Sequence, residues 1–192
     1  MNKAVFLDKD GTLIPDIPYN VNPDLITLQD GAAEGLRKLQ QLGFMLIIIS
    51  NQAGVAKGHF KTEALEGVQK RLTELFESEG LTLTAFYYCP HHPEGSVKPY
   101  AIECVCRKPK AGMFLKAAAD FNIDLSSSWM IGDILHDVEA GNSAGCRSIL
   151  IDNGNETEWY INEFRKPNYL AGNINDAAGF ILKNIPKPLA IL

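Results

Sequence analysis

The sequence predicts an α/β fold, in which a Rossmann-like parallel sheet carries helices on both of its faces. Short apolar runs alternate along the chain with longer segments whose apolar residues recur at helical spacing. The short runs are continuously apolar, which is typical of parallel strands buried on both sides. The chain has 192 residues, enough for one sizeable hydrophobic core, and shows no internal repeat or linker-like segment. We therefore expect a single domain over residues 1–192.

The first half of the chain shows this alternation clearly. Residues 4–7 are all apolar and are predicted to form a buried strand. Residues 32–42 carry apolar side chains at helical spacing, and a glycine follows where helices commonly end. Residues 45–49 are again continuously apolar and predict a second strand. Residues 63–79 form a long amphipathic helix with one apolar face, also followed by a glycine.

The second half repeats the pattern with shorter elements. In chain order it predicts a strand at 85–88, a helix at 111–121, a strand at 129–131, a helix at 135–144, a strand at 148–151, a short edge strand around Leu170 and a final helix at 175–183. Strand and helix thus alternate to the end, as in sheets built from parallel strands and crossover helices.

Composition excludes several classes of protein. A net charge of −5 argues against a protein that wraps nucleic acid through general basicity. The longest apolar run, around residues 44–49, is far shorter than the roughly 20 residues of a membrane-spanning helix, and the N-terminus lacks a signal-like segment. We expect a cytoplasmic monomer with no membrane or nucleic-acid partner. The four cysteines do not suggest a disulfide framework, and Cys146 reads as a small buried apolar residue.

Polar residues that could bind a ligand or take part in catalysis follow the predicted strands. Asp8 and Asp10 follow the first strand, Ser50 follows the second and Asp133 follows the fourth. The carboxyl ends of parallel strands meet at one edge of the sheet, where α/β proteins bind their ligands. An Asp-x-Asp-Gly sequence taken alone indicates a turn as readily as a site. The other polar residues expected at the same edge of the sheet favour a functional site over a simple turn.

The charges at this edge suit a phosphoryl group and a metal ion. Asp137 adds a further acidic group, and converging carboxylates would repel one another unless a cation joined them. Mg²⁺ is the expected ion because it binds carboxylates, water and phosphate oxygens. The stretch CRKPKAG places Arg107, Lys108 and Lys110 ahead of the helix at 111–121. Cations at a helix N-terminus are well suited to binding phosphate.

In order along the chain, FLDKDGTLI, the serine after MLIII, Lys108 and IGDILHD resemble the four motifs of the haloacid dehalogenase superfamily of phosphatases. The similarity runs from Val5 to Asp137, and the remainder of the chain is compatible with it. It implies a haloacid dehalogenase-like fold and a Mg²⁺-dependent phosphomonoester hydrolase. The segments after Thr12 and Ser50 are too short to hold a cap domain, so we expect an open crevice.

The resemblance also implies a role for each motif residue. Asp8 would attack phosphorus and form an aspartyl-phosphate, and Asp10 would protonate the leaving oxygen and then activate water. Asp8, the backbone carbonyl of Asp10 and Asp133 would bind Mg²⁺. Ser50 and Lys108 would bind oxygens of the transferred phosphoryl group.

A second metal site is predicted in the loop at residues 89–106. Cys89, His91, Cys104 and Cys106 form a C-x-H pair and a C-x-C pair, four donors that suit tetrahedral Zn²⁺. The alternative is a set of unrelated surface cysteines, but a loop of this length without secondary structure is unusual unless something pins it. Four protein ligands leave no open position, so the zinc would be structural and would fasten the loop that presents the basic residues.

A zinc loop in a capless phosphatase narrows the resemblance to one branch of the superfamily. DGTLIPDIPYN, SNQAGVAKGHF, YYCPHHPEGS and CRKPKAGM are similar to stretches of the branch that removes the C7 phosphate of D-glycero-D-manno-heptose 1,7-bisphosphate. That reaction gives heptose 1-phosphate for nucleotide-activated heptose, a precursor of lipopolysaccharide or another glycan. Histidinol-phosphate phosphatases share the motifs but have a shorter connection than the twelve residues between His91 and Cys104.

The substrate contacts are expected around the motifs. Arg107 is the expected cation for the second phosphate and Lys57 is a second candidate, although a solvated loop lysine explains Lys57 as well. Asn51 and Gln52 are expected to meet sugar hydroxyls or phosphate. His92 is left without an assigned role beside the zinc ligands.

One position departs from the resemblance. Ile134 stands where relatives usually have Lys or Arg, which removes one basic contact and bears on affinity or preferred substrate. Asp137 is expected to orient Lys108 rather than to bind metal. Two further alternatives are a phosphatase for another small phosphorylated metabolite and an inactive zinc-stabilised binding module. The complete set of motif residues disfavours the inactive module.

Overall fold

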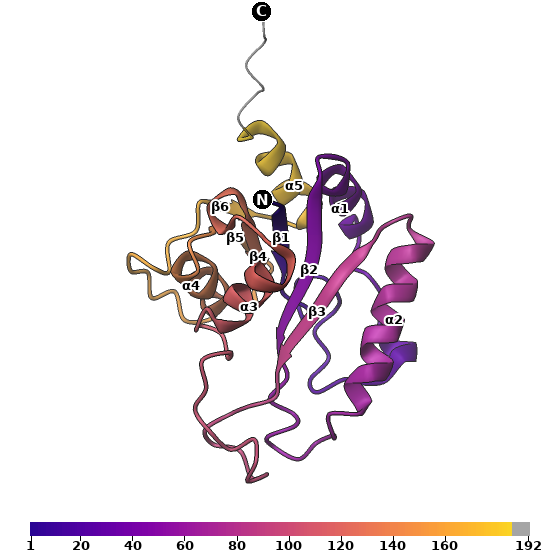
Figure 1. The fold of residues 1–192 in the computed structure, drawn as a ribbon, viewed down its shortest axis with the longest axis vertical. Helices are drawn as coiled ribbons and strands as arrows, with labels where there is room; N and C mark the ends of the chain where they lie inside the picture. Colours follow the sequence, from indigo (N-terminus) through magenta and orange to yellow (C-terminus); the bar gives the residue numbers. More distant parts are fainter. Residues whose placement is uncertain (186–192) are drawn as a thin grey trace, which may run out of the picture.

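The computed structural model describes residues 1–185 and shows one six-stranded sheet with helices around it (Figure 1). The strands are β1 (Lys3–Leu7), β2 (Phe44–Asn51), β3 (Leu83–Cys89), β4 (Trp129–Gly132), β5 (Arg147–Ile151) and β6 (Tyr169–Ala171). The helices are α1 (Ala32–Gln41), α2 (Ala64–Ser78), α3 (Gly112–Phe121), α4 (Leu135–Ser143) and α5 (Ile174–Lys183), with 3₁₀ turns η1 (Pro23–Leu25) and η2 (Leu125–Ser127). All neighbouring strands pair in parallel, which confirms the predicted fold class.

The two faces of the sheet are covered by different helices. Val5 and Leu7 of β1 point into the larger core, which α1, α2 and α5 cover. Ala4 and Phe6 of the same strand point into a second core, which α3 and α4 cover. Figure 1 shows α2 on one side of the sheet and α3 with α4 on the other. Alternate residues of one strand thus enter two cores, and this explains why the strand is apolar throughout.

The order of the strands places a crevice at the end of β1. The order is β3-β2-β1-β4-β5-β6, so the chain leaves β1 toward β2 on one side and later returns to β4 on the other. In sheets of this kind the ligand site lies beyond the carboxyl ends of the strands at that reversal. Loops and η1 alone separate β1 from α1, and residues 90–111 after β3 contain no helix or strand. Within the described chain, no cap domain covers the crevice.

Two strands are longer than their apolar runs. β2 continues through Ser50 to Asn51, and β3 continues to Cys89. The pairs Ser50↔Tyr88 and Asn51↔Cys89 extend the parallel ladder past the last apolar residue of β2. Backbone pairing can continue wherever the partner strand is present, so the polar residues occupy the strand ends themselves.

None of the helices within residues 1–185 combines the length and the apolar character that crossing a membrane requires.

Candidate active site and metal centre

The turn after β1 brings Asp8 and Asp10 to the carboxyl edge of the sheet. The backbone N–H of Asp8 donates to the carbonyl of Ile131 in β4 at 3.0 Å, so Asp8 still follows the line of the strand. Gly11 then has a φ of +86°, a left-handed conformation that favours glycine. A Cβ atom at Gly11 would collide with the Asp133 carboxylate. The glycine therefore allows the turn to pass close to the fourth strand's acidic residue.

Three buried carboxylates meet beyond β1 and β4. Oxygen atoms of Asp8, Asp133 and Asp137 all lie within 4.8 Å of one another. Burial, with the neighbouring Asp8 carboxylate, raises the pKa of Asp133 to about 6. Thr12 Oγ1 donates to Asp133 Oδ1 at 2.9 Å and Asn155 Nδ2 donates to Asp133 Oδ2 at 2.7 Å, so both oxygens of this carboxylate are held.

Lys108 enters the carboxylate cluster from the loop before α3. Its Nζ lies against Oδ1 of Asp8, 2.7 Å from Oδ1 of Asp137, and donates to the carbonyl of Ile49 at 3.0 Å. Burial works to lower the pKa of the Lys108 ammonium, but the carboxylates of Asp137 and Asp8 outweigh it and raise that pKa above its usual value. Lys108 therefore stays charged although only 3% of it is exposed.

Asn51 holds the backbone of Lys108 in place. Its Nδ2 donates to the Lys108 carbonyl at 3.0 Å, and its Oδ1 accepts from the Lys108 N–H, also at 3.0 Å. This pair of hydrogen bonds connects the end of β2 to the basic loop. The side chain expected to meet substrate is here engaged in fixing the position of the lysine.

Asp10 has its own set of partners. Lys9 Nζ lies 2.5 Å from Oδ1 of Asp10, and Gln52 Nε2 donates to Oδ2 at 3.1 Å. The same Gln52 amide donates to Ser50 Oγ at 2.8 Å, so Gln52 links the end of β2 to Asp10. Burial raises the pKa of Asp10 above its usual value, although Lys9 opposes the shift. A carboxyl group that holds its proton more readily is suited to acid catalysis.

The charges at this edge fit a Mg²⁺ ion. Among residues 1–185, the carboxylates of Asp8, Asp10, Asp133 and Asp137 form ion pairs only with the ammonium groups of Lys9 and Lys108. The carboxylates outnumber the ammonium groups, so a cation would reduce the repulsion among them, and the donors are the hard oxygens that Mg²⁺ prefers. Oδ1 of Asp137 pairs with the Lys108 ammonium, and Oδ2 accepts from the Ile134 N–H at 3.3 Å. Both contacts are as expected for a residue that orients the lysine.

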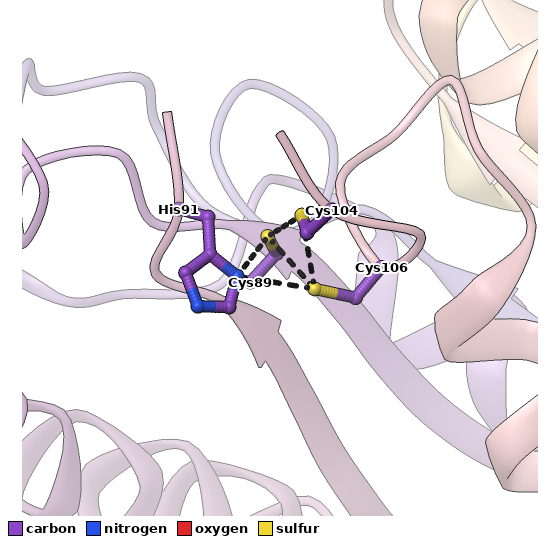
Figure 2. Close-up of side chains that lie close together, drawn as sticks. All are labelled: Cys89, His91, Cys104 and Cys106. Carbon is purple, nitrogen blue, oxygen red and sulfur yellow. Dashed lines mark hydrogen bonds between the residues drawn. The ribbon is translucent and has the colours of Figure 1, made fainter. Parts of the chain in front are cut away.

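The four predicted zinc ligands converge in the loop after β3 (Figure 2). Cys89 is the last residue of β3, and His91, Cys104 and Cys106 come from the loop. Neighbouring sulfur and Nδ1 atoms lie 3.1 to 3.7 Å apart. A zinc tetrahedron with Zn–S bonds of about 2.3 Å separates its ligand atoms by about 3.5–3.8 Å. The donor set and its spacing therefore fit Zn²⁺ with no position left open.

Two cavities flank the carboxylate cluster. One of about 380 Å³ is lined by Arg107, Lys108, Lys110, His92 and His136 among others. The other, of about 280 Å³, lies on the Asp10 side and is lined by Tyr19, Asn51 and Gln52 among others. The first is lined by the side chains of Arg107, Lys108 and Lys110, which are groups that can bind anions.

Lys57 and His92, the two residues left open by the sequence, have defined partners. Lys57 Nζ donates to the hydroxyl of Tyr19 at 3.1 Å and lines neither of the two cavities. His92 lies outside the group of four zinc-ligand atoms, and its Nδ1 accepts from the Glu94 N–H at 3.1 Å.

Sequence reasoning missed three residues that touch the acidic groups. Lys9 is fully buried against Asp10, while Thr12 and Asn155 hold Asp133. Lys9 could have been found, because a lysine between two aspartates at a strand end needs a partner when it is buried. Asn155 gave no local signal, since its contact depends on where a distant loop folds.

Comparison with known proteins agrees with this geometry. Residues 105–177 match the model of the HAD-hydrolase-like family. The chain is 42% identical to the D-glycero-beta-D-manno-heptose-1,7-bisphosphate 7-phosphatase of Haemophilus ducreyi over 154 residues, covering 79% of this chain and 84% of that protein. The protein of the same name from Escherichia coli K12 is 35% identical, covering 83% of this chain and 88% of its own.

A solved structure shows the same architecture. The D,D-heptose 1,7-bisphosphate phosphatase of B. bronchiseptica, complexed with magnesium and phosphate, superposes with a TM-score of 0.76 and 25% identity. The match covers 95% of this chain and 99% of that one. These similarities confirm the family resemblance drawn from the motifs.

Proposed function

Because the chain belongs to the haloacid-dehalogenase-like hydrolases, in the family of the D-glycero-beta-D-manno-heptose-1,7-bisphosphate 7-phosphatases, we propose that it removes the C7 phosphate of that heptose bisphosphate. The products are heptose 1-phosphate and inorganic phosphate. The β anomer is proposed because the curated relatives carry it in their names. The observation that carries the proposal is the meeting of Asp8, Asp10, Asp133 and Lys108 at one open edge of the sheet.

The reaction begins with Asp8 as the nucleophile. A carboxylate oxygen of Asp8 attacks phosphorus, a P–O bond forms and the bond from phosphorus to the C7 oxygen breaks. Asp10 gives its proton to that leaving oxygen, so the sugar departs as an alcohol. Gln52 and Lys9 fix the Asp10 side chain for this transfer.

The second half of the reaction reverses the role of Asp10. Now a carboxylate, it takes a proton from a water molecule, which attacks the phosphorus of the aspartyl-phosphate. The bond between phosphorus and the Asp8 oxygen breaks, and phosphate is released. Both halves need the phosphoryl oxygens held in one orientation, which we assign to Ser50 and Lys108.

The two metals have separate tasks in this proposal. Asp8, the Asp10 carbonyl and Asp133 would hold Mg²⁺, whose charge offsets that of the phosphoryl oxygens as the bonds change. Cys89, His91, Cys104 and Cys106 would hold structural Zn²⁺ and fasten the loop that carries Arg107. Arg107 Nη1 also donates to a backbone carbonyl of that loop, at 3.3 Å.

Arg107 is our candidate for the second phosphate. It lines the cavity of about 380 Å³ beside Lys108, where a phosphate at the far end of a sugar would meet a positive lining. Gln52 lines the other cavity and can offer its amide oxygen to sugar hydroxyls. Asn51 contributes through its hold on Lys108. The proposal also includes a single domain acting as a cytoplasmic monomer.

Substrate comparison tests this function. The purified protein is assayed for Mg²⁺-dependent phosphate release from the α and β anomers of the heptose bisphosphate and from histidinol phosphate. We expect the highest kcat/KM for the β-bisphosphate. A higher kcat/KM for histidinol phosphate would overturn the assignment, and a higher value for the α anomer would overturn the anomeric preference alone.

A further inference from the structure

The segment between β5 and β6 reaches back to the acidic cluster. Asn153 Nδ2 donates to the Gly11 carbonyl at 2.8 Å, and Asn155 Nδ2 donates to Asp133 Oδ2 at 2.7 Å. Glu156 Oε2 accepts from the Leu135 N–H at 2.5 Å, at the start of α4. Three contacts within four residues therefore connect this segment to the turn after β1, to Asp133 and to α4. Figure 1 shows the segment running past α4 at the edge of the molecule.

The contact from Asn155 has a specific effect on Asp133. Thr12 donates to one oxygen of the carboxylate and Asn155 donates to the other, and the two donors come from distant segments of the chain. Two donors fix the rotation of the carboxylate plane, whereas one would leave it free to turn. Each carboxylate oxygen can accept more than one partner, so both retain capacity for a metal ion.

Other hydrogen bonds, within the segment itself, also contribute to its order. The backbone N–H of Asn155 donates to Asn153 Oδ1 at 3.1 Å, and the N–H of Glu158 donates to Glu156 Oε1 at 2.7 Å. These local turns order the segment through other groups. The Asn155 side chain leaves the segment and ends on a buried carboxylate, although Asn155 as a whole is exposed.

We propose that Asn155 is a positioning residue for magnesium, holding the Asp133 carboxylate in the orientation that binds the ion. The inference rests on the proposed Mg²⁺-dependent function. Without the Asn155 donor, the Asp133 carboxylate would lose rotational freedom only when Mg²⁺ binds. Because that loss of entropy opposes binding, the affinity for Mg²⁺ should fall. Residues that hydrogen-bond to metal ligands are worth about 10- to 100-fold in metal affinity or activity.

Direct titration with Mg²⁺ alone tests this role. Binding is measured calorimetrically on the zinc-loaded, substrate-free protein, for the wild type and for Asn155→Ala, Asn155→Gln and Asn162→Ala. Asn162 is the matched control, because its side chain lies in the same segment and, within the described part of the chain, accepts only from the Phe164 and Arg165 N–H groups, at 2.9 and 3.0 Å. We expect Asn155→Ala to weaken Mg²⁺ binding roughly tenfold. Asn155→Gln should recover part of the loss, and Asn162→Ala should match the wild type.

Kinetics provide a second readout. The Mg²⁺ concentration for half-maximal phosphate release should rise in Asn155→Ala by the same factor as the dissociation constant, while kcat at saturating Mg²⁺ stays near the wild-type value. A purely structural role would lower kcat and the melting temperature and leave the Mg²⁺ requirement unchanged.

Two results would overturn the inference. One is a Mg²⁺ dissociation constant for Asn155→Ala within about twofold of the wild type, well below the effect expected of such a contact. The other is an equal weakening in Asn162→Ala, which would assign the effect to the order of the segment. Because Mg²⁺ is titrated without substrate, a failure to hydrolyse the heptose bisphosphate would count against the proposed function and not against Asn155. If Asn155→Ala does not fold, the Mg²⁺ dissociation constant of Asn155→Gln is compared with that of the wild type in its place, and a value within about twofold would overturn the inference.

Discussion

The ammonium group of Lys108 lies 2.7 Å from Oδ1 of Asp137, a carboxylate with no exposed surface. The same ammonium touches the Asp8 carboxylate, so Asp137 helps to determine where the lysine lies relative to Asp8, the proposed nucleophile. Lys108 comes from the loop next to the zinc cluster, whereas Asp137 lies on α4. The ion pair thus joins two separate parts of the chain at the proposed active site.

Replacing Asp137 by Asn should cost both stability and activity. Breaking a buried ion pair by removing one partner lowers the free energy of unfolding by about 3–5 kcal/mol when the remaining charge is left uncompensated. The loss here should lie toward the lower end of that range, because the buried Lys108 ammonium keeps the Asp8 carboxylate as a second partner. Denaturant unfolding measures this loss, and a phosphate-release assay should show a lower kcat. Glu34→Gln is the control: Glu34 pairs with Lys38 at the same 2.7 Å, but on the exposed surface of α1, so stability should hardly change. Equal losses in the two variants would contradict the role given to Asp137.

Replacing Asp8 by Asn should abolish phosphate release without unfolding the protein. The amide has the size of the carboxylate but cannot act as the nucleophile. Steady-state turnover measures the first effect, and circular dichroism with a melting curve measures the second. Residual turnover near the wild-type rate in a preparation free of wild-type enzyme would show that another group attacks phosphorus.

Replacing Cys104 by Ser should remove zinc from the loop after β3. The Cys104 sulfur lies 3.5 Å from Cys89 Sγ and 3.3 Å from Cys106 Sγ, within the group of four donors. Zinc per chain, measured by elemental analysis, should fall from about one to a small fraction. Cys146→Ser provides the control, because Cys146 is buried in the core beneath α3 and α4, outside the cluster. Unchanged zinc in Cys104→Ser would remove this residue from the ligand set.

Replacing Arg107 by Ala should affect a bisphosphate more than a monophosphate. A hydrogen bond to a charged group is worth about 1.5–3 kcal/mol, which corresponds to a loss of about 10- to 150-fold in kcat/KM for the bisphosphate. Heptose 7-phosphate should be hydrolysed at a nearly unchanged rate. Lys110→Ala is a useful comparison: Lys110 lines the same cavity but pairs with Glu103 at 3.7 Å and is half-exposed, so a smaller effect is expected. An equal loss on both substrates would place Arg107 away from the second phosphate.

Much of this architecture could be predicted from the sequence. Continuous apolar runs indicated parallel strands, and parallel strands bring their carboxyl ends to one edge. That rule placed Asp8, Ser50 and Asp133 together although they are far apart in sequence. The spacing of Cys89, His91 and the C-x-C pair also predicted that these four side chains would converge, as they do.

Other contacts had no local pattern to reveal them. The strands end later than their apolar runs predict, because pairing with β3 extends β2 to Asn51. The Asn51 side chain hydrogen-bonds to the Lys108 backbone, and Asn155 donates to Asp133, which lies 22 residues away in the sequence. Such hydrogen bonds depend on how loops lie after folding, and a single Asn in a loop has many possible partners. The roles of the substrate-binding residues stay predictions.

Crystallography of the Mg²⁺-loaded protein with beryllium fluoride tests most directly whether Asp8 receives the phosphoryl group. The account predicts a beryllium atom bonded to an Asp8 carboxylate oxygen, with fluorine atoms against Lys108 Nζ and Ser50 Oγ. Beryllium fluoride bound elsewhere in the crevice, with the Asp8 carboxylate unmodified, would contradict it.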